Sequence, residues 1–252
     1  MGSETQVITG GAIHGGTYTT RNLAGYPIGG FWLIPCDGYF NSVEEVNAYQ
    51  KDGNLIQPSA APGDIRFKDT NNDGTINDGD RVYSGSPFPD FTYSLNITAQ
   101  YKNWDFSITF QGVLGNKIYN ATRLELEDVT RGTNYLRTTL NSWTETNHNA
   151  SVPRLIWNDP NRNARSESNR FLENGDYLRL RSIQLGYTLP KTIFNGIIKS
   201  TRVYATVDNL FTITGYSGFT PDVNSTNVYQ RGFDEFIYPA NRTIMLGVNV
   251  TF

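Results

Sequence analysis

The chain has 252 residues and a formal net charge of −3, with 18% charged, 13% aromatic and 38% hydrophobic residues. The weak negative charge and the lack of a basic stripe argue against nucleic acid as a partner, and no run of about 18 apolar residues provides a transmembrane helix. A mean hydropathy of −0.45 still permits a membrane β-barrel, whose strands are apolar on only one face. Abundant Gly and Tyr with few charges predict an all-β protein.

The N-terminal part has few clear signals. Residues 1–26 lack the basic and apolar regions of a signal peptide, so we expect the exported part of the protein to begin upstream. Residues 26–40 are strand-like but interrupted by Gly and Pro, and they include Cys36, which we expect to be a small apolar strand residue. A single cysteine excludes a disulfide framework. Ser42 followed by Glu45 is typical of a capping box and predicts a short helix.

A short strand over residues 64–69 leads into the one stretch with metal-ligand spacing. Oxygen-bearing residues recur at the positions of a calcium loop, with Gly74 at the sharp turn. The residues that would bind Ca²⁺ are Asp69, Asn71, Asp73, Thr75 (through its backbone carbonyl), Asn77 and Asp80. The alternative is a set of Asx turns that holds a surface loop. The sequence leaves both interpretations open. It therefore predicts no cofactor with certainty, and a structural Ca²⁺ in this loop is the one candidate.

A hairpin over residues 91–111 has the clearest pattern in the chain. Apolar and polar residues alternate along both halves, and a two-residue connection, Lys102–Asn103, places both apolar sets on one face. Tyr101 and Trp104 then meet at the turn, where aromatic residues of a barrel lie at the membrane interface.

Residues 116–175 are polar, contain Trp143 and Trp157, and are expected to form a long functional loop. His148 lies in this segment without a nearby His or Cys, and we expect it to be solvated.

The C-terminal part contains three more strands. In residues 176–190 the apolar parity switches, which indicates either a β-bulge near Arg181 and Ser182 or a strand that rises clear of the membrane there. Residues 201–214 keep one apolar parity apart from Asn209, and residues 243–252 alternate without a break. Short connections at 102–103 and 190–200 alternate with long ones at 116–175 and 214–241. This asymmetry is typical of outer-membrane barrels, which have short turns at one end and long loops at the other.

Several segments in this order resemble the C-terminal part of SusC/RagA-type TonB-dependent outer-membrane transporters of Bacteroidetes. They are GYPIGGFW, DGYFNSVEEVNAY, PGDIRFKDTNNDGTINDGDRVYSGSPFPDFTYSLN, YKNWDFSITFQGVLGNKIYN, DYLRLRSIQLGYTLP, RVYATVDNLFTITGYSGFTPDVN and the final strand. The resemblance implies that residues 1–252 are an incomplete portion of a large antiparallel transmembrane β-barrel, without its plug domain and most of its strands.

The resemblance also implies a function, a location and partners. The protein would be a multi-pass barrel in the Gram-negative outer membrane that imports glycans or peptides with a SusD-like surface lipoprotein. It would contact the lipid bilayer, and it would reach the TonB complex through the missing N-terminal part. Phe252 would be read as a C-terminal signal by the barrel-assembly machinery. The residues expected to face the lumen are Thr92, Ser94, Asn96, Thr98, Asp105, Ser107, Thr109, Asn249 and Thr251.

Two other function classes remain for comparison. A secreted, calcium-stabilised, carbohydrate-binding β-sandwich would stack sugar rings on Trp143, Trp157 or loop tyrosines. A hydrolase would use paired carboxylates such as Glu125 with Glu127 or Asp234 with Glu235, but no nucleophile–base set accompanies them. We therefore expect these acidic pairs to be solvated and the protein not to be an enzyme.

Overall fold

The computed structural model describes residues 7–8, 12–13, 17–190, 198–223 and 231–252. Strands dominate, nearly all of them in antiparallel sheets, as the sequence predicts. The chain folds as two compact units, each built from three stretches of sequence. Unit 1 comprises Met1–Phe88, Lys117–Glu173 and Val223–Phe236, and unit 2 comprises Pro89–Asn116, Asn174–Asp222 and Ile237–Phe252. No helix in the described residues is long and apolar enough to span a membrane.

Unit 1 contains several small sheets with short strands. A four-stranded antiparallel sheet has the order β1-β4-β5-β10, and a three-stranded sheet has the order β14-β13-β17, in which β13 and β17 run parallel. The described residues also form the two-stranded pairs β2–β3, β6–β9 and β7–β8. The bounds are β1 Val7–Ile8, β2 Ala12–Ile13, β3 Thr17–Tyr18, β4 Thr20–Asn22, β5 Gly30–Leu33, β6 Cys36–Tyr39, β7 Gln50–Lys51, β8 Asn54–Leu55, β9 Ile65–Phe67, β10 Val82–Gly85, β13 Lys117–Asn120, β14 Leu172–Asn174 and β17 Phe233–Asp234.

Two α-helices lie in the described part of unit 1, and a polar side chain caps the N-terminus of each. Helix α1, Val43–Ala48, starts where the capping box predicts: Ser42 Oγ accepts a hydrogen bond from Glu45 N at 3.3 Å, and Glu45 accepts one from Asn41 N at 2.8 Å. Helix α2, Ala121–Glu127, starts at Asn120, whose side chain accepts from the backbone N–H of Arg123. These bonds satisfy donors that the first helical turn leaves unpaired. Single 3₁₀ turns cover Asp78–Asp80, Val129–Arg131, Arg137–Asn141 and Asn169–Phe171.

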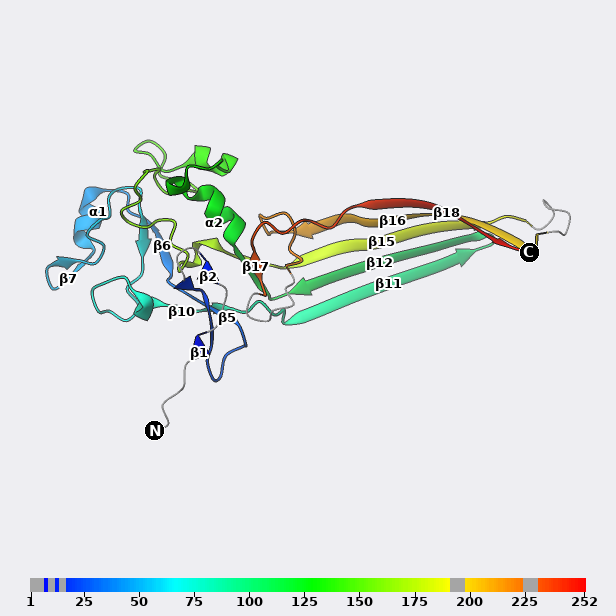
Figure 1. Ribbon diagram of the computed structural model, residues 1–252, viewed down its shortest axis with the longest axis horizontal. Helices are drawn as coiled ribbons and strands as arrows, with labels where there is room; N and C mark the ends of the chain where they lie inside the picture. Colours follow the sequence, from blue (N-terminus) through cyan, green and yellow to red (C-terminus); the bar gives the residue numbers. More distant parts are fainter. Residues whose placement is uncertain (1–6, 9–11, 14–16, 191–197, 224–230) are drawn as a thin grey trace. The chain divides into compact units, whose positions relative to one another are not determined.

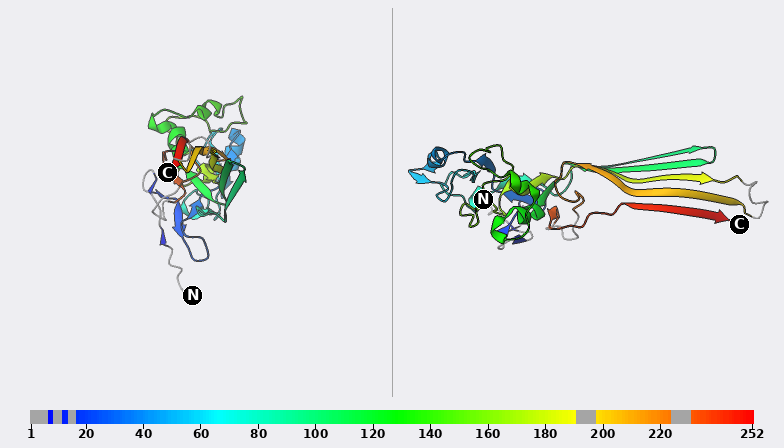
Figure 2. Two further views of the ribbon diagram at one scale, coloured as in Figure 1. Left: turned by 90° about the vertical axis from the view of Figure 1, so that its right-hand side faces the viewer. Right: turned by 90° about the horizontal axis from the view of Figure 1, so that it is seen from above.

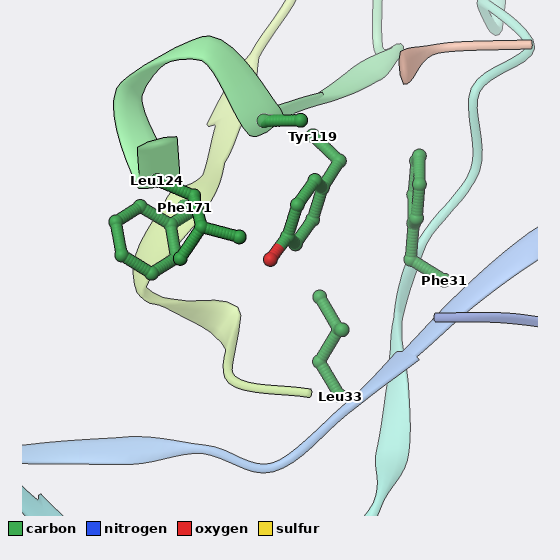
Figure 3. Close-up of a cluster of buried hydrophobic side chains, with 6 residues drawn as sticks. Phe31, Leu33, Tyr119, Leu124 and Phe171 are labelled. Carbon is green, nitrogen blue, oxygen red and sulfur yellow. The ribbon is translucent and has the colours of Figure 1, made fainter. Parts of the chain in front are cut away.

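The main core of unit 1 joins segments that are far apart in sequence (Figure 3). Phe31 and Leu33 of β5 pack with Tyr119 of β13, Leu124 of α2 and Phe171, each at most 1% exposed. The Tyr119 hydroxyl donates to the carbonyl of Ser166 at 2.7 Å, and burial raises the Tyr119 pKa well above its usual value. The phenol therefore stays neutral and acts as a donor inside the core.

The segment 116–175 corrects the prediction of a long polar loop. It contributes Tyr119, Leu124 and Phe171 to the core, together with β13 and α2. Some of its charged residues are paired inside the unit: Glu127 is buried between Arg123 and Arg170, and Arg154 of this segment pairs with the buried Asp64 of the preceding part of the chain. The expectation that the acidic pairs are solvated is wrong for Glu127, and also for Asp234, whose side chain is fully buried.

Side-chain amides close the free edge of β9 in unit 1. Gln57 accepts from Phe67 N at 2.8 Å and donates to Ile65 O at 3.0 Å, while Asn163 accepts from Ile65 N at 2.8 Å. These amides replace a neighbouring strand and leave the buried backbone groups satisfied. Cys36 on β6 packs beside this strand, and burial raises its thiol pKa to about 11, which fits the predicted role of a small strand residue.

Unit 2 is a single antiparallel sheet of long strands in the order β11-β12-β15-β16-β18 (Figures 1 and 2). The predicted hairpin is present, with Tyr101 opposite Trp104 across the two-residue turn. Most of the predicted short connection at 190–200 lies outside the described residues. The bounds are β11 Phe91–Tyr101, β12 Trp104–Leu114, β15 Tyr177–Thr188, β16 Ser200–Thr214 and β18 Thr243–Thr251.

Replacement of Tyr119 tests the buried hydrogen bond of the unit 1 core. Tyr119→Phe keeps the ring but leaves the Ser166 carbonyl unpaired, so we expect a loss of about 1–2 kcal/mol in the free energy of unfolding. Tyr135→Phe is the control, because Tyr135 is 42% exposed and water can replace its bond to the Val129 carbonyl. Denaturant unfolding of the intact protein measures both, and equal effects would contradict the structural role of the Tyr119 hydroxyl.

Candidate functional site

The sheet of unit 2 has one apolar face that is continuous across all five strands. The register places residues of the same parity side by side, so one row runs Ala99, Phe106, Leu185, Ala205, Leu246 and the next runs Ile97, Ile108, Ile183, Val207, Ile244. Successive strand residues point to opposite faces, so these rows share one side of the sheet.

No second layer covers this face within the described part of unit 2, whose strands all belong to one sheet. The exposed fractions are 84% for Leu246, 71% for Ile244 and 61% for Val248. Soluble proteins rarely leave an apolar area of this extent in water, and such an area marks an interaction surface. A β-sandwich would have placed a second sheet here.

The predicted bulge keeps the apolar face continuous. Pairing of β15 with β12 and with β16 shifts between Leu180 and Ser182, which leaves Arg181 as the extra residue. Opposite this point β16 contains Asn209, whose backbone φ of 52° is unusual for a residue other than glycine. Leu180 and Phe211 beyond the bulge therefore point to the same side as Ile183 and Val207 before it. This register confirms the interpretation of the parity switch as a bulge.

The opposite face carries a polar network. The Arg202 guanidinium forms an ion pair with Asp105 and donates to Gln184 Oε1 at 3.0 Å, and Gln184 Nε2 donates to Thr206 Oγ1 at 2.9 Å. Gly186 allows the Arg202–Asp105 pair to cross β15, because a Cβ there would lie 2.4 Å from Arg202 Nη2. Farther along, Ser182 Oγ donates to Asp208 Oδ1 at 2.6 Å.

The nine residues predicted to face a lumen all lie on this polar face. The pairs Asn96–Thr109 and Thr98–Ser107 continue into Ser182 and Gln184 of β15, and Asn249 lies opposite Arg202. That the face encloses a lumen stays a prediction. Sequence reasoning missed Gln184, Arg202, Thr206 and Asp208. Arg202, Thr206 and Asp208 alternate with Val203 and Val207 along one strand, and Gln184 alternates with Ile183 along the other. This alternation would have identified all four residues.

Arg179 holds the segment after β16 against the polar face of unit 2. Its guanidinium donates to Thr212 Oγ1 at 3.1 Å and to Asp222 Oδ2 at 3.0 Å. Thr220 and Tyr216 of this segment are buried. Part of the long connection predicted at 214–241 is therefore packed onto the sheet rather than extended from it, while residues 224–230 lie outside the described residues.

Aromatic residues gather at the turn end of the apolar face. Tyr101 and Trp104 are 69% and 48% exposed, and the Trp104 ring lies 4.7 Å from that of Tyr187. The Lys102 ammonium lies 5.3 Å from the centre of the Tyr101 ring. Amphipathic rings and a cation at the end of an apolar sheet match the composition of a membrane interface, although this role also stays a prediction.

The calcium-like loop of unit 1 is held by its own side chains. Asp69 accepts from the backbone N–H groups of Asp73 and Gly74, and buried Asp80 accepts from those of Thr70 and Asn77. The Asp73 carboxylate accepts hydrogen bonds from Asn77, Asn71 and Thr75, and these bonds lower its pKa. The Asx-turn interpretation accounts for each of these contacts.

Metal binding by the same loop stays a prediction. Within the residues that the structure describes, no three His, Cys, Asp or Glu side chains gather in a way that could hold a metal ion. A Ca²⁺ ion in this loop would therefore depend on the amide and carbonyl oxygens of Asn71, Thr75 and Asn77 as well as on the carboxylates.

The sugar-stacking residues proposed for a soluble binding module are not equally available. Trp143 is only 6% exposed, with its ring against His148, so it cannot serve as a sugar platform. Trp157 is 63% exposed. His148 is exposed, as expected, and its Nε2 lies 3.0 Å from the Glu145 carbonyl oxygen.

A long-stranded antiparallel sheet with one apolar and one polar face, short turns at one end and long connections at the other, defines a piece of an outer-membrane-type β-barrel. No family model matches the chain. It is 33% identical over 228 residues to TonB-dependent receptor P3 of Formosa agariphila, covering 85% of this chain and 22% of that protein. It is 29% identical over 208 residues to TonB-dependent receptor SusC of Bacteroides thetaiotaomicron, covering 82% and 19%.

Solved structures agree with these relatives. The structure of the RagAB peptide transporter superposes with a TM-score of 0.71 at 23% identity, covering 93% of this chain and 24% of that chain. The resemblance is confirmed: the chain is a segment related to the SusC/RagA-type TonB-dependent receptors. It spans about a fifth to a quarter of the length of the relatives that it matches.

The calcium prediction is tested by thermal unfolding of the intact protein in Ca²⁺ and in chelator. If the loop holds Ca²⁺, the ion raises the unfolding temperature, and Asp73→Asn removes this increase because it removes a charged ligand. Asp78→Asn is the control in the same loop, since Asp78 lies outside the ligand positions and pairs with Arg81. Identical unfolding temperatures in calcium and in chelator would show that the side chains act only as turn supports.

Proposed function

We propose that the chain is the C-terminal portion of the barrel of a TonB-dependent importer in the Gram-negative outer membrane. The observation that carries this proposal is the uncovered apolar face of unit 2, since lipid is a solvent in which such a face is stable. The strands of this sheet have 9 to 15 residues, and about 9–11 residues are needed for a tilted strand to cross the hydrocarbon core. The similarity to TonB-dependent receptors supports the same conclusion.

The two ends of the sheet then have different surroundings. The Lys102–Asn103 turn lies at one end. The long connections lie at the other end, where they follow Leu114 and Thr214 and precede Tyr177. In this proposal the short turns face the periplasm, and the long connections, including those that build unit 1, are extracellular. The polar face with Asp105 and Arg202 lines the lumen or contacts the plug, which is contributed by sequence outside this chain.

The partners follow from the same assignment. A SusD-like surface lipoprotein covers the extracellular side, the TonB complex acts through a part of the protein outside this chain, and Phe252 is read by the barrel-assembly machinery. The solute is a glycan or a peptide. RagAB, part of which shares the fold of this chain, is a peptide transporter, and the chain is also similar to TonB-dependent receptor SusC. Exposed Trp157, Tyr135 and Leu155 of unit 1 are available for such contacts.

Binding of the solute is measured on the intact protein purified together with its lipoprotein. We expect titration with oligosaccharide and peptide mixtures to give saturable binding for one class only, since a site built to pair polar groups rejects ligands that leave those groups unpaired. Saturable binding to the isolated, detergent-free chain without membrane insertion would instead support a soluble binding module.

A charge on each face tests the membrane assignment directly. Leu246→Arg places a cation in the middle of β18 on the apolar face, at an expected cost of about 2–4 kcal/mol in the bilayer. Met245→Arg is the matched control, because Met245 is the adjacent residue on the polar face, opposite Thr206. We expect Leu246→Arg to reduce the folded protein in the outer-membrane fraction, and Met245→Arg to leave it near the wild-type amount. The reverse order would exclude lipid contact by the apolar face.

A further inference from the structure

The apolar face of unit 2 is hollowed at one place. A groove of about 590 Å³ is lined by Trp104, Leu185, Tyr187, Val203, Ala205, Leu246 and Val248. Its volume lies within the range of about 300–1,000 Å³ that is typical of ligand sites. All of its lining residues come from four neighbouring strands of the sheet, β12, β15, β16 and β18.

The short side chain of Ala205 creates the groove. The register places Ala205 between Leu185 on β15 and Leu246 on β18, and the adjacent row places Val203 between Tyr187 and Val248. A methyl group between two longer side chains leaves a gap in the surface. Tyr204 and Gly247, which alternate with these residues and lie opposite each other, complete its floor.

The groove begins at the aromatic, basic end of the sheet. The Trp104 and Tyr187 rings, 4.7 Å apart, both line it. Exposed Lys102 lies in the adjoining turn, and exposed Lys199 lies at the same end, where its N–H donates to the Thr251 carbonyl at 2.8 Å. The Asp105 carboxylate of β12 is on the opposite face and is paired with Arg202. The site therefore combines an apolar channel with two cations near its end.

We propose that this groove binds one membrane phospholipid, with an acyl chain over Ala205 and the phosphate near Lys102 and Lys199. The apolar walls of the groove would contact the acyl chain, and cations at the membrane interface attract an anionic headgroup. This inference rests on the proposed membrane location and adds a defined lipid site to it. A uniform apolar surface would instead exchange lipids without selection.

The test is native mass spectrometry of the intact protein released from nanodiscs that contain phosphatidylethanolamine and phosphatidylglycerol. Ala205→Phe fills the groove, and we expect about tenfold weaker retention of bound phospholipid, because several methylene contacts are lost. Ala99→Phe is the matched control: Ala99 lies on the same face, opposite Phe106, and outside the groove. It should retain lipid as the wild type does.

Replacement of both lysines by alanine tests the contacts of the lipid headgroup separately from those of the acyl chain. We expect Lys102→Ala with Lys199→Ala to keep bound lipid but to reduce the preference for phosphatidylglycerol by about fivefold per lysine.

If the wild type inserts into nanodiscs and Ala205→Phe retains lipid like Ala99→Phe, the lipid site is wrong and the importer assignment stands. If the wild type does not insert at all, both are wrong. A dimer that Ala205→Phe disrupts would show that a second copy of the chain occupies the groove.

Discussion

In-plane strand pairing is the constraint on which the rest of unit 2 depends. Each strand satisfies its backbone groups through its neighbours, so the side chains alone decide what each face can contact. The rows through Leu185 and Leu246 make one face apolar across five strands, while Asp105, Arg202 and Gln184 pair on the other. The bulge at Arg181 preserves this division between the two faces, because without it every residue of β15 beyond that point would lie on the other face.

Unit 1 encloses its apolar side chains in a core, whereas unit 2 leaves one apolar face uncovered. Its core of Phe31, Tyr119 and Phe171 is enclosed, and it also buries charges, as in the pairing of Glu127 with Arg123 and Arg170. Breaking such a pair would leave an uncompensated charge, so these contacts bind separate chain segments to one arrangement. A unit of short strands and irregular connections needs this kind of specification, because few of its segments form long hydrogen-bonded ladders.

Local patterns predicted the elements whose partners are near in sequence. The hairpin predicted at residues 91–111, the cap at Ser42 and the bulge near Arg181 follow from patterns within single stretches of sequence, and all three are present. The fate of residues 116–175 could not be predicted in the same way. Tyr119 is buried by Phe31, and Asp64 by Arg154, across long separations in sequence that composition and periodicity do not encode.

The sequence by itself determined which residues share a face of each long strand, because alternation is a property of the extended backbone. It also determined the family, through the order of several segments. Only the tertiary structure decided which strands are neighbours beyond the predicted hairpin, that Trp143 is buried while Trp157 is exposed, and that Ala205 lies between two leucines. These facts depend on register between distant segments, and register is fixed by the packing of whole strands rather than by any one stretch of sequence.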